Sequence, residues 1–343
     1  MGSAPSGAPA TASAPAAPSA PRGAPVDAGD GGPTWLELLC AGVGFGLALI
    51  AFLLVVPGAV YPPALLMFAL LAAGYFGVSI RAARNAAAAA VPGGLAGAAL
   101  GPLLLVAAAC AYAAAAGLPV LTRAIAYTGY LLVPTLLLVL GTRTRWLPEL
   151  GLLAAVTLGA TIKFHLLQAL PLPPPRGLDG IRLVALVAAF WLFLVRPGLD
   201  GIGYTFALRG RDLLTALRAY GVYALAALPL GLALGFLRWH PRPGALQLLL
   251  APVTIYVETA IPEEFLFRGL IQNLLVRRIG ERAGWVVASL VFGLAHLPDP
   301  RYAFLAFLAG LAYGWTYRRT GRITASALTH AAVDWTWVVL LHG

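Results

Sequence analysis

Ionisable side chains gather within apolar stretches of the last third of the chain. Glu258, Glu263, Glu264 and Arg268 lie on one apolar run, His296 at the end of the next, and His330 with Asp334 on the last run. A charge in hydrocarbon costs about 2.5–3.5 kcal/mol on insertion scales, so such groups are candidates for function. Buried carboxylates and histidines can relay protons, and Glu and His are also zinc ligands. The residue types therefore indicate proton transfer or metal chemistry in an apolar environment.

The spacing on the first of these runs separates the two adjacent carboxylates. Glu264 and Arg268 are four residues apart with the acid first, which is the favourable order for an ion pair along a helix. Glu263 is rotated by about 100° from Glu264, given about 3.6 residues per turn. We therefore expect Arg268 to neutralise Glu264 and to leave Glu263 available.

Helical rise predicts that the polar groups approach a common depth. Each run ends in arginines at one side, and counting about 1.5 Å per residue from them gives a distance for each group. The distances are roughly 21 Å for Glu263, roughly 21 Å for His296, roughly 18 Å for Asp334 and roughly 12 Å for His330. Three helices are therefore expected to contribute to one polar cluster.

The composition identifies the environment of these helices. Of 343 residues, 60% are hydrophobic and 10% are charged, whereas a soluble globular domain carries about 25% charged residues. Apolar runs near the ~20 residues that cross a bilayer recur along the chain. The sequence therefore predicts an all-α, polytopic transmembrane helix bundle of about eleven helices, with the lipid bilayer as a partner.

The chain divides into a tail and two blocks of helices. Residues 1–34 are rich in Ala, Pro, Ser and Gly and are expected to be disordered. The N-terminal block, 35–196, is predicted to hold six helices, near Trp35–Pro57, Ala64–Ile80, Gly94–Ala116, Val120–Gly141, Leu147–Leu170 and Gly180–Val195. The second block, 199–343, is predicted to hold five, near Leu213–Leu237, Ala245–Val276, Ala283–Leu297, Tyr302–Tyr317 and Thr324–Leu341. In the fourth of these, Gly310 and Gly314 form a GxxxG spacing that favours close helix packing.

The arginines between the runs predict the orientation. If the helices alternate, five arginine-rich loops share one side, those of Arg81/Arg84, Arg143/Arg145, Arg196/Arg209/Arg211, Arg277/Arg278/Arg282 and Arg318/Arg319/Arg322. The positive-inside rule makes that side cytoplasmic, together with the N-terminus.

Several other classes of function are not supported. The net charge of +10 comes from residues between apolar runs rather than on a basic face, so no nucleic-acid partner is expected. Cys40 and Cys110 lie in separate runs with no CxxC spacing. A phosphate-binding loop or dinucleotide fingerprint is absent, so neither a nucleotide nor another cofactor is expected.

Three short motifs occur in order on the polar helices. Residues 263–268 read EEFLFR and match EExxxR, residues 292–296 read FGLAH and match FxxxH, and residues 330–334 read HAAVD and match HxxxN/D. Together they resemble the CAAX protease and bacteriocin-processing family, which includes type II CAAX prenyl endopeptidases and proteins related to lysostaphin resistance. The resemblance covers roughly 199–341 and does not extend to the N-terminal block.

The resemblance implies an intramembrane endopeptidase with Glu263, Glu264, Arg268, His296, His330 and Asp334 in its site. Glu263 would act as general base and, with His296, activate a water molecule. His330 and the residue four positions later would stabilise the oxyanion, but ionised Asp334 can only accept hydrogen bonds. We therefore expect Asp334 to orient His330, and His330 to donate to the oxyanion. A zinc mechanism stays possible, because Glu263 and the two histidines are legitimate zinc ligands. The chain has no HExxH motif, and a metal-free mechanism is preferred on the basis of the resemblance.

Other interpretations stay open at this point. Taken singly, His296 could be an interfacial residue and the Glu264–Arg268 pair could be purely structural. A binding or immunity protein that keeps the fold without catalysis is the main alternative, and a proton-coupled transporter is a third. For a protease we expect a membrane-associated or lipid-anchored protein or peptide as substrate, and the composition suggests a bacterial inner membrane.

Overall fold

The computed structural model describes residues 34–55, 61–164, 167–171, 180–241, 244–297 and 299–342. The predicted disordered tail lies outside the described residues except for Thr34. Within these ranges the chain forms helices and one two-stranded antiparallel sheet. The expected all-α polytopic bundle is confirmed.

The helices of the N-terminal block follow the apolar runs. They are α1 (Thr34–Val55), α2 (Tyr61–Tyr75), the short turn η2 (Gly77–Ser79), α3 (Arg81–Ala90), α4 (Gly94–Ala115), α5 (Val120–Thr142), α6 (Leu147–Phe164), α7 (Gly180–Phe190) and its π-helical extension η3 (Trp191–Val195).

One of these helices differs from the sequence prediction, which placed Arg81 and Arg84 in a loop. The structure has the ten-residue helix α3 there, with no buried residue. Its run of five alanines from Ala86 to Ala90 explains the helix, because alanine has the highest helix propensity. Ten residues are too few to cross a bilayer, so α3 does not change the predicted alternation.

The second block begins after the polar stretch 196–209. Its elements are α8 (Gly210–Ala233), β1 (Arg238–Trp239), α9 (Ala245–Thr254), η4 (Ile255–Ala260), α10 (Ile261–Glu264), η5 (Phe265–Gln272), α11 (Asn273–Ile279), α12 (Glu281–Leu294), α13 (Pro300–Thr320), α14 (Ile323–Leu340) and β2 (Leu341–His342). The strands β1 and β2 pair in antiparallel fashion and tie the end of α8 to the end of the described chain.

The elements from α9 to α11 form one helix interrupted by the two π-helical segments η4 and η5. Pro262 has no backbone N–H, so the carbonyl five residues earlier, of Val257, lacks a π-helical partner. The hydroxyl of Tyr75 in α2 donates to that carbonyl at 2.7 Å. π-Helical turns are frequent at functional sites, and here they flank the Glu263–Glu264 pair.

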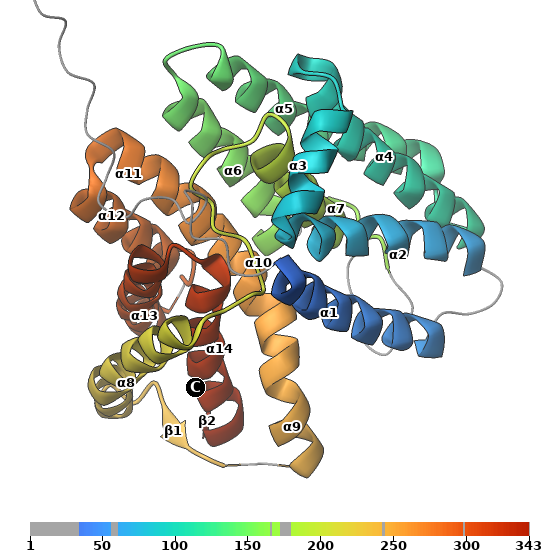
Figure 1. Cartoon of the computed structure of the whole chain (residues 1–343). Helices are drawn as coiled ribbons and strands as arrows, with labels where there is room; N and C mark the ends of the chain where they lie inside the picture. The colour runs from blue at the N-terminus through green and yellow to red at the C-terminus, as the bar shows by residue number, and fades with distance from the viewer. Residues whose placement is uncertain are drawn as a thin grey trace, which may run out of the picture.

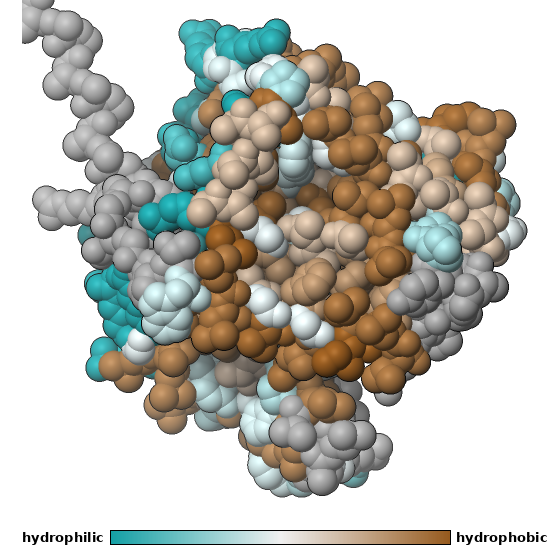
Figure 2. All heavy atoms as spheres, turned by 45° about the vertical axis from the view of Figure 1, so that its right-hand side comes forward, coloured by the Kyte–Doolittle hydropathy of each residue, from teal (hydrophilic) through white to brown (hydrophobic). Residues whose placement is uncertain are grey.

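The surface of the bundle matches a hydrocarbon solvent. Five helical segments are long and apolar enough to cross a membrane, Trp35–Leu54, Pro62–Ser79, Gly94–Ala115, Val120–Thr142 and Gly210–Ala233. Large apolar side chains point outward along them, for example Leu54, Leu121, Val222 and Leu225. Figure 2 shows a broad hydrophobic face with polar residues gathered towards its edges. The protein is therefore an integral membrane protein.

The two blocks share one apolar core, and α6 of the N-terminal block lies beside the segment from η5 to α11 (Figure 1). Phe190 of α7 packs edge-on against Phe265 of η5, with ring centroids 4.4 Å apart, and stacks on Tyr204 at 4.7 Å. At Gly159 of α6 an added Cβ would lie 2.7 Å from Leu266, so the glycine permits this close approach. The division of the chain into two domains stays a prediction, and the core runs through both blocks.

Contacts between loops place the arginine-rich segments at one end of the bundle. The connections between them are Arg81 to Glu37 (3.1 Å), Arg84 to Tyr204 (3.5 Å), Arg196 to Ala88 (2.9 Å), Arg277 to Asp200 (2.5 Å), Arg278 to Glu149 (2.7 Å) and Arg322 to Asp212 (3.3 Å). All five predicted loops and the start of α1 are joined in this way, as alternation of the helices requires.

We expect this end of the bundle to face the cytoplasm. Reporter fusions made after Arg84, Arg145, Arg211 and Arg282 should all give a cytoplasmic signal, because positively charged loops are retained on that side. Paired alkaline phosphatase and green fluorescent protein fusions measure this. An extracytoplasmic signal after Arg282 would invert the orientation of the polar site.

Candidate active site

A network of ionisable groups is buried between α10, η5, α13 and α14. At its centre is Glu264, whose side chain has no exposed surface. Its Oε1 accepts from Arg268 Nη1 at 3.0 Å and from His330 Nδ1 at 2.8 Å, and its Oε2 accepts from the Ser326 hydroxyl at 2.5 Å. Both oxygens are thus satisfied, which a buried carboxylate requires.

The predicted ion pair between Glu264 and Arg268 is present, and Arg268 has further partners. Its Nη2 donates to the Gly310 carbonyl at 3.1 Å. The guanidinium carbon lies 4.5 Å from the ring centroid of Phe292 and 5.1 Å from that of Tyr313, within cation–π range. Arg268 therefore links the motif helix to α12 and α13 as well as neutralising Glu264.

The GxxxG spacing on α13 brings that helix close to its neighbours. A Cβ added at Gly310 would lie 3.1 Å from the Cα of Ser289, and one at Gly314 would lie 2.6 Å from Oε1 of Gln272. The predicted close packing at this spacing is confirmed, and it brings the Gly310 carbonyl within reach of Arg268.

His330 lies between two carboxylates on opposite sides of its ring. Nδ1 faces Glu264 at 2.8 Å, and Nε2 lies 3.4 Å from Oδ2 of Asp334. The ring stacks on Tyr313 at 4.5 Å with an interplanar angle of 14°. The sequence led us to expect that Asp334 would orient His330, but the closer, fully buried carboxylate is Glu264. Since an ionised Glu264 can only accept, this bond places a proton on Nδ1.

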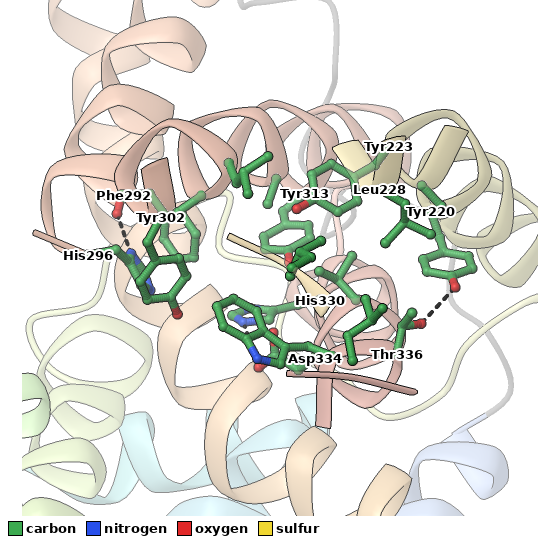
Figure 3. A pocket seen from close by; sticks show the side chains of 18 of the residues that line it. Tyr220, Tyr223, Leu228, Phe292, His296, Tyr302, Tyr313, His330, Asp334 and Thr336 are labelled. Atoms are coloured by element: carbon green, nitrogen blue, oxygen red, sulfur yellow. Dashed lines mark hydrogen bonds and ion pairs between the residues drawn. The ribbon is translucent and has the colours of Figure 1, made fainter. Parts of the chain in front are cut away.

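A cavity of about 200 Å³ opens next to this network. Four predicted site residues line it, Glu263, His296, His330 and Asp334, whereas Glu264 and Arg268 lie behind its wall. Figure 3 shows His296 beside Tyr302 on one side of the cavity and His330 with Asp334 across from them. The structure therefore brings the three motifs together. Glu263, His296, His330 and Asp334 face the cavity, and Glu264 and Arg268 lie behind them.

Glu263 and His296 differ from the buried pair in their exposure. Both are half-buried, which leaves them accessible from the cavity. His296 Nδ1 lies 2.7 Å from the Phe292 carbonyl one turn earlier, and since a carbonyl can only accept, Nδ1 carries the proton. Its Nε2 is then the nitrogen that can take up a proton. The i,i+4 spacing of FxxxH is the reason that this backbone bond forms.

A catalytic zinc ion needs three protein side chains that converge on one point. Both ring nitrogens of His330 face carboxylates. Within the described ranges, no group of three or more His, Cys, Asp or Glu side chains is arranged to hold one metal ion.

Sequence reasoning missed Ser326, Tyr313 and Phe292 as partners of the network. Ser326 lies four residues before His330, so helical periodicity alone places both on one face of α14 and could have identified it. Phe292 is the first residue of FxxxH and contacts Arg268. Tyr313 has no signal in its own sequence context, because only the tertiary packing of α13 against α14 brings it under His330.

Two further carboxylates, Glu258 and Asp334, differ in their position relative to the cavity. Glu258, which lies outside the motifs, is exposed on η4 and does not line the cavity. Asp334 lines it with 30% of its side chain exposed.

Comparison with known proteins finds a similar family for part of the chain. The family described as "Type II CAAX prenyl endopeptidase Rce1-like" matches residues 244–336, the segment from α9 to α14 that carries all three motifs. No curated protein and no solved structure matches the chain. Over residues 244–336 this integral membrane protein is therefore similar to the Rce1-like CAAX prenyl endopeptidase family.

Proposed function

We propose that the protein is an intramembrane endopeptidase that hydrolyses a peptide bond in a membrane-associated or lipid-anchored protein or peptide. The observation that carries this proposal is the meeting of Glu263, His296, His330 and Asp334 from three helices at one cavity, within the segment that matches a protease family. A protein that only binds a partner has no need for a general base and an oxyanion donor facing the same space.

Glu263 acts as the general base in this mechanism. It takes a proton from a water molecule as the water oxygen forms a bond to the carbonyl carbon of the substrate. His296 Nε2 accepts a hydrogen bond from the same water, because its Nδ1 is held by the Phe292 carbonyl. The proton on Glu263 passes to the leaving amine as the peptide C–N bond breaks, so no external acid or cofactor is required.

His330 stabilises the oxyanion of the tetrahedral intermediate. Glu264 fixes the ring by accepting from Nδ1, and the two flanking carboxylates stabilise a positive charge on the imidazole. Nε2 is then a donor directed to the cavity. The 3.4 Å between Nε2 and Asp334 is longer than a good hydrogen bond, so the substrate oxygen can compete for this nitrogen.

The orientation that we propose places the substrate near the far side of a bacterial inner membrane. The cavity is lined by Phe236, Leu237 and Leu341, which adjoin the β1–β2 pair, whereas the arginine-rich loops lie at the other end. With the N-terminus and these loops in the cytoplasm, the scissile bond enters from the extracytoplasmic half of the bilayer.

Cleavage by the full-length protein in liposomes tests the function. The probe is a farnesylated CaaX peptide with a fluorophore and a quencher on either side of the scissile bond. We expect cleavage at one bond, verified by mass spectrometry, in a protein that holds less than stoichiometric metal and resists chelators. A companion experiment compares membrane proteins that accumulate uncleaved in cells that carry Glu263→Gln.

Other outcomes would contradict the proposal in distinguishable ways. Binding of the peptide without cleavage would favour a non-catalytic binding or immunity protein. Near-stoichiometric metal together with chelator sensitivity would instead make Glu263 and His296 metal ligands.

A further inference from the structure

The oxyanion site of this chain has a donor missing. An asparagine at position 334 could donate a hydrogen bond, but the Asp334 present here only accepts when ionised and would repel a developing negative charge. His330 Nε2 is the single donor that the motif residues supply. A tetrahedral oxyanion is stabilised far better by preorganised donors than by one donor beside a carboxylate.

The cavity wall offers hydroxyl groups that could supply the second donor. Four tyrosines line it, Tyr220, Tyr223, Tyr302 and Tyr313. The hydroxyl of Tyr220 is engaged with Thr336 at 2.7 Å. Among the residues that the structure describes, no hydrogen bond engages the hydroxyls of the other three tyrosines.

Tyr302 is the best placed of these three. Its ring is fixed by three aromatic neighbours, at centroid distances of 5.5 Å to Phe236, 4.9 Å to Trp337 and 4.8 Å to His296. Figure 3 shows its hydroxyl directed towards the space between His296 and the His330–Asp334 pair. A rigid ring keeps the donor in place without reorganisation during the reaction.

Contacts across the cavity distinguish Tyr302 from the other tyrosines. Tyr302 shares the cavity lining with Glu263 on one helix and with His330 and Asp334 on another. Its ring contacts that of His296, the proposed partner of the base, whereas the ring of Tyr313 stacks on His330. The Tyr302 hydroxyl is therefore placed near both the proposed base and the position opposite it, where the substrate carbonyl must sit.

We infer that the Tyr302 hydroxyl is a catalytic residue that donates a hydrogen bond to the oxyanion and supplies the donor that Asp334 lacks. The inference rests on the proposed hydrolysis. The phenol keeps its proton throughout, so the step adds no transfer to the reaction. The hydrogen bond strengthens as negative charge develops on the substrate oxygen, which lowers the barrier without tighter binding of the substrate.

Tyr302→Phe tests this role with the farnesylated CaaX peptide in liposomes. We expect kcat to fall by about 10²–10³-fold, the usual loss for one oxyanion donor, with KM changed little. Tyr130→Phe is the matched control, because its hydroxyl donates to the Thr157 carbonyl at 2.6 Å, far from the cavity wall. It should retain wild-type kcat.

The Asp334→Asn background separates a catalytic from a structural role. The new carboxamide can donate to the oxyanion. The fold loss of kcat caused by Tyr302→Phe should therefore be at least about tenfold smaller in this background than in the wild type. A structural role would give the same loss in both backgrounds. Equal losses, or a fully active Tyr302→Phe beside an inactive Glu263→Gln, would overturn this inference alone. A wild-type protein that cleaves no peptide, or an active Glu263→Gln, would instead overturn the proposed function on which it rests.

Discussion

Glu263→Gln should abolish proteolysis and leave the fold intact. The glutamine has nearly the same shape but cannot accept a proton from water, and general-base catalysis is typically worth about 10²–10⁴-fold. Glu263 is half-buried at a cavity, where a neutral amide of the same shape can still be solvated. We expect kcat on the farnesylated CaaX peptide to fall by at least two orders of magnitude, while the thermal unfolding temperature in detergent stays within a degree or two of the wild type.

Glu258→Gln is the control for this variant. Glu258 lies on the same continuous helix, is exposed, and does not line the cavity. It should keep full activity, which excludes a general effect of removing a carboxylate from this helix. Wild-type activity in Glu263→Gln would remove Glu263 from the role of base and leave the mechanism without one.

Arg268→Ala should destabilise the protein strongly, with any loss of activity following from that. It leaves the carboxylate of Glu264 buried without its guanidinium partner, removes the donor to the Gly310 carbonyl and empties the space between Phe292 and Tyr313. Breaking a buried ion pair from one side costs about 3–5 kcal/mol. Lower abundance in membranes and a lower thermal unfolding temperature should both be measurable. Glu264→Gln should be less stable than the wild type for the same reason.

Two further variants show whether the burial of the pair causes this effect. Arg278→Ala removes an ion pair with Glu149 whose side chains are 60% and 35% exposed, and exposed pairs contribute only about 0–1 kcal/mol. The double variant Arg268→Met with Glu264→Leu removes both buried charges and should recover part of the lost stability. An Arg268→Ala protein as stable as Arg278→Ala would show that the network is dispensable for folding.

Periodicity predicted most of the scaffold and the identity of the cluster. The apolar runs predicted the helices, because each segment that spans a bilayer must satisfy its own backbone hydrogen bonds. The i,i+4 spacing predicted the Glu264–Arg268 pair. Counting residues from the arginines predicted that Glu263, His296 and Asp334 lie at a similar depth, and all three line one cavity.

Features that depend on neighbouring helices were not accessible from the sequence. The rotamer of His330 decides which carboxylate faces which nitrogen, so Glu264 and Asp334 could not be assigned to Nδ1 and Nε2 from spacing. The donor to the Val257 carbonyl, beside the π-helical turns, comes from α2, and the ring of Tyr302 at the cavity packs on Phe236, which precedes β1. α3 was missed because its alanines carry neither a polar nor a strongly apolar signal.

The hydrogen bond from Tyr75 to the Val257 carbonyl makes the inherited motif region dependent on the helices outside it. A fragment that begins at α9 would present that carbonyl, and the faces of Phe265 and Leu266 that now meet α7 and α6, to lipid tails. Hydrocarbon cannot hydrogen-bond to the carbonyl, and the helix would relax towards a different pitch around Glu263. The segment that matches other proteins is therefore smaller than the set of helices that stabilises it. A scaffold that receives the three motifs would also need a hydrogen-bond donor for the Val257 carbonyl.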